Sequence, residues 1–150
     1  MAPEPYQKIY LYKRIVQAKL FIDRHYAEKI DLHNIADEAN FSKFHFIRLF
    51  RTIYGKTPHH YLTQVRIDNA KRLLAAGSSP SDACFHVGFE SATSFAALFK
   101  KLVGTTPSAF QHKQAERKKA VAASPLRFIP NCFAETHGWT KNSNFEEAAR

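Results

Sequence analysis

The amino-acid sequence predicts an all-α fold of about seven helices, organised as two helix-turn-helix subdomains joined by a long linker helix. Two observations carry this prediction. Residues 50–61 and 99–110 repeat one phrase at a constant offset of 49 positions, with Phe, Gly, Thr and Pro recurring in the same order. The segments 35–50 and 83–99 each have the pattern of a short helix, a tight turn and a second helix. Such a repeat indicates one structural unit used twice.

A long amphipathic helix opens the first subdomain, which is expected over residues 8–57. Asp31 can cap a second, shorter helix, and Asn40 falls at the sharp turn after it, where Asn tolerates the left-handed backbone conformation. The inward-facing residues of the long helix recur at steps of three and four: Leu11, Ile15, Ala18, Ile22 and Tyr26. Those of the short helix are Leu32, Ile35, Ala36 and Ala39.

We call the second helix of each helix-turn-helix its recognition helix. The first recognition helix is expected to begin after Ser42, whose hydroxyl can cap it, and to end at Gly55. Thr57 and Pro58 then form the pattern of an N-cap followed by Pro at the first helical position, which opens the linker helix of residues 58–77. The inner residues of the recognition helix are Phe46, Leu49, Phe50 and Ile53. Those of the linker helix are Leu62, Val65, Ala70, Leu73 and Leu74.

The second subdomain, expected over residues 78–112, repeats this order. Ser79 can cap a short helix, Gly88 takes the turn position that Asn40 has in the first copy, and Ser91 can cap the second recognition helix. Thr106 opens a last helix. The inner residues of the short helix are Ala83, Cys84 and Val87, and those of the second recognition helix are Phe95, Leu98, Phe99 and Leu102.

The remaining residues, 113–150, form a tail that is first basic and then aromatic, and the sequence assigns it no role. The part after residue 124 is too rich in large apolar side chains for a solvated tail. It either folds back on the helices or meets a partner. These side chains are Leu126, Phe128, Ile129, Phe133, Trp139 and Phe145.

The chain is strongly basic, with a formal net charge of +9 at pH 7. The excess of Lys and Arg is spread over both sides of residue 112, which suits a polyanionic partner. No stretch approaches the roughly 18 consecutive apolar residues of a membrane span, and the start has no signal-peptide core. We therefore expect a soluble, cytoplasmic protein without a membrane partner.

Metal, cofactor and catalytic sites are not expected. Cys84 and Cys132 lack the spacing of a metal site, and the eight histidines form no clear ligand pair. The motifs of the common hydrolases, metalloproteases and nucleotide-binding proteins are also missing from the sequence.

One outer face of the first recognition helix carries residues suited to DNA. Arg48 could donate two hydrogen bonds to a guanine, whereas Phe44 and Ile47 could contact thymine methyl groups or instead belong to the core. We call this face the first recognition surface: Lys43, Phe44, Ile47, Arg48 and Arg51. Phosphate contacts are expected from Ser42, Lys43, Arg51 and Lys56.

The matching face of the second helix carries small side chains. Its first turns contain no Arg, Gln or Asn to read a base, so we expect it to contribute shape and phosphate contacts, or a structural role alone. We call it the second recognition surface: Ala92, Thr93, Ala96, Ala97 and Lys100. Phosphate contacts are expected here from Ser91, Lys100 and Lys101.

Together these residues resemble the DNA-binding region of the AraC/XylS family of bacterial transcription regulators, over about residues 8–112. The resemblance rests on the following motifs: Ile35-Ala36, SKFHFIRLFR from Ser42, Gly55-Lys56-Thr57-Pro58, Arg66 with Ala70 and Leu73-Leu74, Val87-Gly88-Phe89, Ser91, Phe95, Phe99-Lys100, and Gly104-Thr105-Thr106-Pro107 with Phe110.

The resemblance implies an asymmetric promoter site bound through two recognition helices, and activation of transcription through RNA polymerase. The base-reading positions of the family fall on Phe44, Ile47 and Arg48 in the first unit, and on Ala92, Thr93 and Ala97 in the second. Most members also carry a separate effector-binding or dimerisation domain, and the sequence identifies no effector.

Two other classes of function stay open. A helical adaptor that binds proteins through its aromatic tail would not bind duplex DNA at moderate salt. An enzyme, such as a DNA-repair protein that uses this module for targeting, would need a nucleophile or metal cluster that the sequence does not display. A steep dependence of affinity on salt would distinguish DNA binding from the adaptor.

Overall fold

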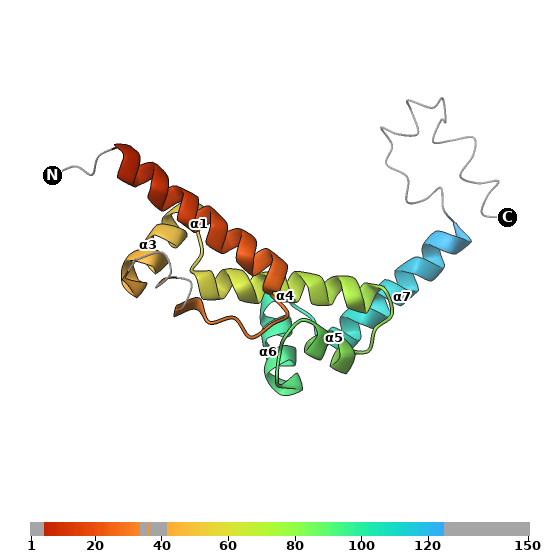
Figure 1. The fold of residues 1–150 in the computed structure, drawn as a ribbon. Coiled ribbons are helices and arrows are strands. Elements are labelled where there is room, and N and C mark those ends of the chain that lie inside the picture. Colours follow the sequence, from red (N-terminus) through yellow and green to blue (C-terminus); the bar gives the residue numbers. More distant parts are fainter. Residues whose placement is uncertain (1–4, 34–35, 37–41, 125–150) are drawn as a thin grey trace, which may run out of the picture.

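The computed structural model describes residues 5–33, 36 and 42–124, and this part of the chain is built from helices without a strand (Figure 1). The all-α prediction is therefore confirmed. The helices are α1 (Pro5–His25), α3 (Lys43–Tyr54), α4 (Pro58–Ala75), α5 (Pro80–His86), α6 (Ala92–Val103) and α7 (Pro107–Ala123). Of the short helix predicted after Asp31, the residues Ile35, Ala39 and Asn40 lie outside the described part.

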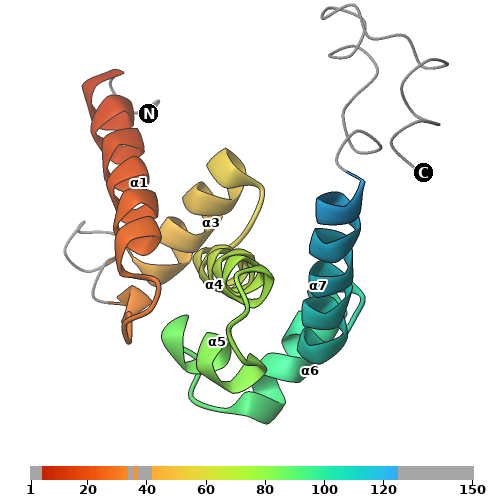
Figure 2. The same ribbon diagram turned by 90° about the vertical axis from the view of Figure 1, so that its right-hand side faces the viewer.

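Helix α4 crosses the middle of the molecule and connects its two halves. Seen along α4, helices α1 and α3 lie on one side of it, and α5, α6 and α7 lie below and on the other side (Figure 2). α4 contributes Leu62 to one buried cluster, whose other members are Ile15, Ala18, Ile22, Ala36, Phe46 and Phe50. It contributes Ile67, Ala70 and Leu74 to a second cluster, which is completed by Ala83, Cys84, Val87, Phe95 and Phe99. Each half thus has its own core, and α4 belongs to both.

The predicted helix caps form in both copies of the repeat. The Ser42 and Ser91 hydroxyls each accept a hydrogen bond from the backbone N–H three residues on, at 3.3 Å in both cases. At the other end of these helices, Gly55 and Gly104 adopt left-handed backbone angles, with φ of 71° and 89°. Only a residue without a Cβ adopts this conformation at no steric cost, so the repeated Gly fixes where α3 and α6 end.

The interior differs from the prediction at four positions, and one of them is Leu98, which is half-buried and lines a groove. Leu102, expected inside, is 46% exposed. Its counterpart Ile53 packs against the first core, whereas Leu102 lines a groove beside polar residues of α4. Ile67 is fully buried although it was not predicted, and Val65 is only half-buried.

Helix α7 extends beyond the predicted subdomain boundary at residue 112. It lies along the C-terminal end of α4, where Gln111 Nε2 donates to the Ser78 carbonyl at 2.8 Å. About two turns later, Lys118 Nζ donates to the Ala75 carbonyl. The first part of the expected tail is therefore helical and attached to the second half.

Candidate nucleic-acid interface

The first recognition surface lies on the outer side of α3. Phe46 and Phe50 point into the core, and the opposite side is therefore left to solvent. Lys43, Arg48 and Arg51 are exposed. The Phe44 side chain is 75% exposed, so it does not belong to the core, whereas Ile47 is half-buried and packs against the first cluster.

The second recognition surface has the same placement on α6. Phe95 and Phe99 take the buried positions, and most of the opposite side is open. Its exposed members are Ala92, Thr93, Ala97 and Lys100, with Lys101 beside them, while Ala96 is half-buried. The small side chains leave the backbone of α6 close to whatever contacts this helix.

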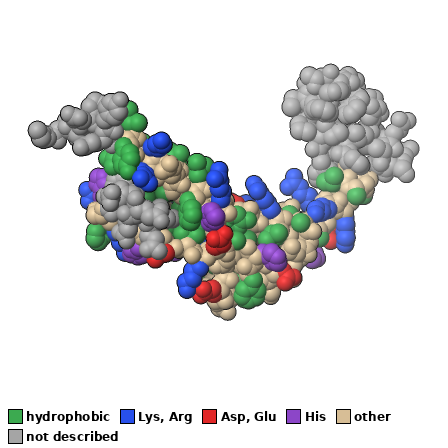
Figure 3. Space-filling model, in the orientation of Figure 1, with side chains coloured by type: hydrophobic (Ala, Val, Ile, Leu, Met, Phe, Trp, Pro, Cys, Tyr) green, Lys and Arg blue, Asp and Glu red, His purple; other side chains and the backbone are tan. Residues whose placement is uncertain are grey.

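Among the residues that the structure describes, no carboxylate forms an ion pair with the basic residues predicted to contact phosphates. Within the described ranges the ion pairs join other residues, such as Lys19 with Asp23 and Lys71 with Asp68. None of them includes Lys43, Arg48, Arg51, Lys56, Lys100 or Lys101. Figure 3 shows Lys and Arg side chains over both halves of the molecule on the face drawn, in agreement with the even charge distribution of the sequence.

The Ser42 and Ser91 hydroxyls cap their helices as acceptors and can still donate a hydrogen bond through their own proton. In the cap each oxygen accepts from a backbone N–H, so its own proton stays available for a phosphate oxygen. Both side chains are exposed at the start of their recognition helix. Their predicted role as phosphate contacts is thus compatible with the cap geometry.

Arg66 of α4 joins the two halves. The sequence indicated this residue only as part of a family motif and did not predict its contacts. Its Nε donates to the Tyr26 carbonyl at 2.7 Å, and its Nη2 donates to the Glu28 carbonyl at 2.9 Å, both just after α1. In the second half, its guanidinium lies 5.7 Å from the centre of the Phe89 ring. Burial lowers the pKa of Arg66, and the Glu90 charge opposes this shift.

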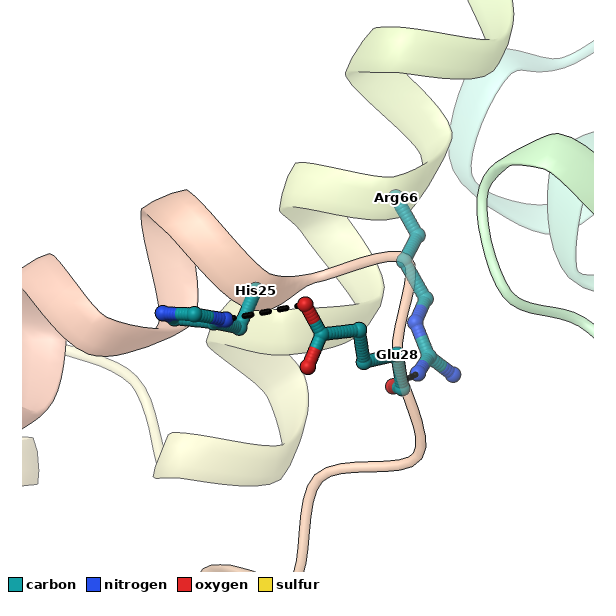
Figure 4. Close-up of polar contacts among 3 residues, drawn as sticks. All are labelled: His25, Glu28 and Arg66. Atoms are coloured by element: carbon teal, nitrogen blue, oxygen red, sulfur yellow. Dashed lines mark hydrogen bonds and ion pairs between the residues drawn. The ribbon is translucent and has the colours of Figure 1, made fainter.

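The loop after α1 is held by further contacts around Arg66. His25 Nδ1 lies 2.9 Å from the Glu28 carboxylate, so Glu28 contacts Arg66 through its carbonyl and His25 through its side chain (Figure 4). Gly88 approaches the same loop from the second half: a Cβ at this position would lie 2.7 Å from the Ala27 carbonyl oxygen. The recognition helices are therefore carried by halves that contact each other closely.

A second polar contact fixes α1 to the start of α4. The Tyr61 hydroxyl donates to Asp23 Oδ1 at 2.7 Å, and Lys19 Nζ lies 2.7 Å from Asp23 Oδ2. Burial raises the pKa of Tyr61, and the hydrogen bond to Asp23 raises it further. The hydrogen bond to Asp23 likewise raises the pKa of Lys19.

Three further findings concern metal binding, membrane crossing and the described cysteine. Among the residues the structure places, no three His, Cys, Asp or Glu side chains gather closely enough to hold a metal ion. Within the same residues, no helix combines the length and the apolar content that a membrane crossing requires. Cys84 is buried in the second core, and burial raises the pKa of its thiol.

Two capped recognition helices, each on its own core and joined by a shared helix, define a double helix-turn-helix protein. The family described as "Helix-turn-helix domain" matches residues 35–113, more than half of the chain. The chain belongs to this family, and its resemblance to the AraC/XylS type is confirmed by the proteins to which it is similar.

Two relatives come from Bacillus subtilis. The HTH-type transcriptional regulator YbfI is 41% identical over 69 residues, which cover 46% of this chain and 25% of YbfI. The bifunctional transcriptional activator/DNA repair enzyme AdaA is 37% identical over 92 residues, which cover 61% of this chain and 44% of AdaA. The chain thus spans less than half the length of either relative.

Solved structures share the fold. The DNA-binding domain of AdpA, determined in complex with a target DNA, superimposes with a TM-score of 0.66 at 25% identity, over 70% of this chain and 96% of that domain. The C-terminal domain of AraT, a response regulator from Geobacillus stearothermophilus, gives a TM-score of 0.63 at 24% identity, over 67% of this chain and 84% of that domain.

Proposed function

We propose that this chain binds double-stranded DNA sequence-specifically and activates transcription, by inserting α3 and α6 into successive major grooves. The observation that carries the proposal is the pair of recognition helices with matching caps and cores but different outer faces. Helix α4, with 18 residues, would hold them about 27 Å apart end to end, close to the roughly 34 Å of one DNA turn. The AdpA domain, which shares this fold and was determined in complex with a target DNA, supports DNA binding by the chain.

The two recognition surfaces would have different tasks. On α3, Arg48 would donate to O6 and N7 of a guanine, and the exposed Phe44 ring would pack on thymine methyl groups beside Ile47. On α6, the exposed Ala92, Thr93 and Ala97 would fit against the groove closely and contribute mainly shape. The exposed Ser42, Lys43, Arg51, Lys56, Ser91, Lys100 and Lys101 would contact phosphates.

The wider role rests on the relatives. AdaA is named a transcriptional activator, and this chain spans 44% of it, so activation through RNA polymerase and action in the cytoplasm are part of the proposal. We assign the chain no catalytic step; the repair activity in the name of AdaA is said of a protein more than twice as long as the matched region.

Selection of bound duplexes from a random pool tests the proposal. The wild-type chain should enrich one asymmetric site with defined bases opposite α3 and weaker preference opposite α6. Arg48→Ala should reduce affinity for that site by about 1–3 kcal/mol and relax the preference at one base position. Arg117→Ala, at an exposed position of α7, is the matched control and should change neither.

Two outcomes would contradict the proposal in different ways. An equal loss on every sequence after Arg48→Ala would remove its base-reading role. Absence of duplex binding at moderate salt by the wild-type chain would instead favour the helical adaptor.

A further inference from the structure

We propose that a basic groove between the two halves binds the DNA sugar-phosphate backbone that runs between the two major-groove sites. This inference rests on the proposed function and adds a third contact region to it. The groove has a volume of about 520 Å³ and is formed by the end of α3, the start of α4 and the end of α6. We call it the interunit groove.

The lining of the interunit groove is suited to an anion. Arg51 and Lys56 line it from the first half, and Lys101 lines it from α6. His59 and His60 line it from the first turn of α4, and no Asp or Glu of the described part of the chain takes part in the lining. Three fixed positive charges without a carboxylate, in a concave surface, attract a polyanion more strongly than the same charges on a convex surface would.

The positive charges in the groove are available. Arg51, Lys56 and Lys101 are all exposed, and none of them forms an ion pair with a residue placed by the structure. The polar neighbour Thr63 is already engaged, because its hydroxyl donates to the His59 carbonyl at 3.0 Å. The charged contacts with phosphates would therefore come from Arg51, Lys56 and Lys101.

The position of the groove points to DNA as its occupant. Arg51 belongs to the first recognition surface, and Lys101 follows Lys100 of the second along α6, so the groove is lined from both recognition helices. A duplex held by α3 and α6 presents the backbone between its two contacted segments to whatever lies between these helices. The groove lies there, and its charge is complementary to phosphate.

The apolar side chains that line the groove would also contact the DNA backbone. Leu98 and Leu102 line it from α6, and Leu102 is 46% exposed despite its size. Deoxyribose presents C–H groups between successive phosphates, and these can pack on the two leucines. The exposure of Leu102, which the repeat did not predict, is thereby explained by a contact that only the bound state provides.

The salt dependence of binding tests the inference. For Lys56→Gln/Lys101→Gln, the slope of log affinity against log salt on the selected site should decrease in magnitude by about 1.8, at about 0.9 for each lost phosphate contact. The same duplexes should still be enriched, since phosphate contacts carry no sequence information. Lys113→Gln, at an exposed position of α7 outside the groove, is the control and should keep the wild-type slope. Melting curves of all three proteins should superimpose.

Uncharged methylphosphonate groups in the DNA backbone test which phosphates the groove contacts. Methylphosphonates placed between the two half-sites should weaken binding of the wild-type chain and of Lys113→Gln, and should have less effect on the double variant. An unchanged salt slope for the double variant, or an equal effect of methylphosphonates on all three proteins, would overturn the groove while leaving two-helix binding intact. A wild-type chain that binds no duplex overturns both.

Discussion

Arg66 and Phe89 join the two halves of the molecule, with the guanidinium of α4 lying 5.7 Å from the centre of the ring that precedes α6. The same guanidinium donates to the carbonyls of Tyr26 and Glu28 at the end of the first half. One side chain thus contacts residues that are far from it in the sequence on both sides. The relative orientation of the recognition helices depends on these contacts.

Arg66→Lys should destabilise the protein. Lys keeps the charge but has neither the planar fork that reaches two carbonyls nor the flat surface that stacks on Phe89. Loss of one or both hydrogen bonds should lower the free energy of unfolding by about 1–3 kcal/mol, as measured by chemical denaturation. Arg72→Lys, at an exposed position of the same helix, should change it by less than about 0.5 kcal/mol. Equal effects of both substitutions would show that the contacts of Arg66 add no stability.

Gly88→Ala should be more destabilising than Gly77→Ala. Both glycines have positive φ, 92° and 104°, so each substitution introduces the strain of a left-handed Ala, about 1–2 kcal/mol. A Cβ at Gly88 would also lie 2.7 Å from the Ala27 oxygen, whereas one at Gly77 meets nothing within 4 Å. The difference between their unfolding free energies measures the contact between the turn and the loop. Identical values would mean that the loop at Ala27 moves aside for the methyl group without cost.

Tyr61→Phe should lower the free energy of unfolding by about 0.5–1.5 kcal/mol near neutral pH, because the hydrogen bond to Asp23 is lost. Burial raises the pKa of Tyr61 above 10.0, so the folded state holds the phenolic proton more tightly than the unfolded chain does. The stabilisation that Tyr61 contributes is fully present below pH 10 and is lost as the pH rises through the pKa of Tyr61 in the folded state. Denaturation at pH 8 and pH 11 should show a smaller difference between wild type and variant at the higher pH. A gap that widened would contradict this sign.

Ser91→Ala should cost about 1 kcal/mol of folding stability, because the first turn of α6 loses the cap that the hydroxyl supplies to the Ser94 N–H. Ser108→Ala, at an exposed position inside the first turn of α7, removes the same atom without removing a cap. Thermal denaturation of both variants checks the prediction, which fails if the two substitutions cost the same.

Local features were predictable from the sequence because their causes are local. The caps at Ser42 and Ser91 depend on a hydroxyl and an N–H three residues apart, and the helix ends at Gly55 and Gly104 depend on one residue each. The inward placement of the paired phenylalanines follows from helical spacing. For these reasons the repeat predicted both recognition helices and the outward side of each.

Long-range features were not predictable in the same way. The Arg66 contacts join residues about forty positions apart, and helical spacing carries no information on such pairs. Ile67 was missed because α4 packs on two cores, so its buried positions do not form a single stripe. The exposure of Leu102 depends on what α4 presents opposite it, which the repeat alone does not specify.

Because α4 belongs to both cores, its length and helical rotation set how α3 and α6 are oriented relative to each other. Leu62 is anchored in one core and Ile67 in the other, and five residues correspond to about 140° of rotation around the helix axis. One residue inserted between them would turn α6 relative to α3 by about 100° and shift it by about 1.5 Å. The angle would change far more than the length. The chain therefore specifies the angle between α3 and α6 as a helical rotation. Under the proposed function, a deletion or insertion in α4 would alter which side of the duplex each half can meet.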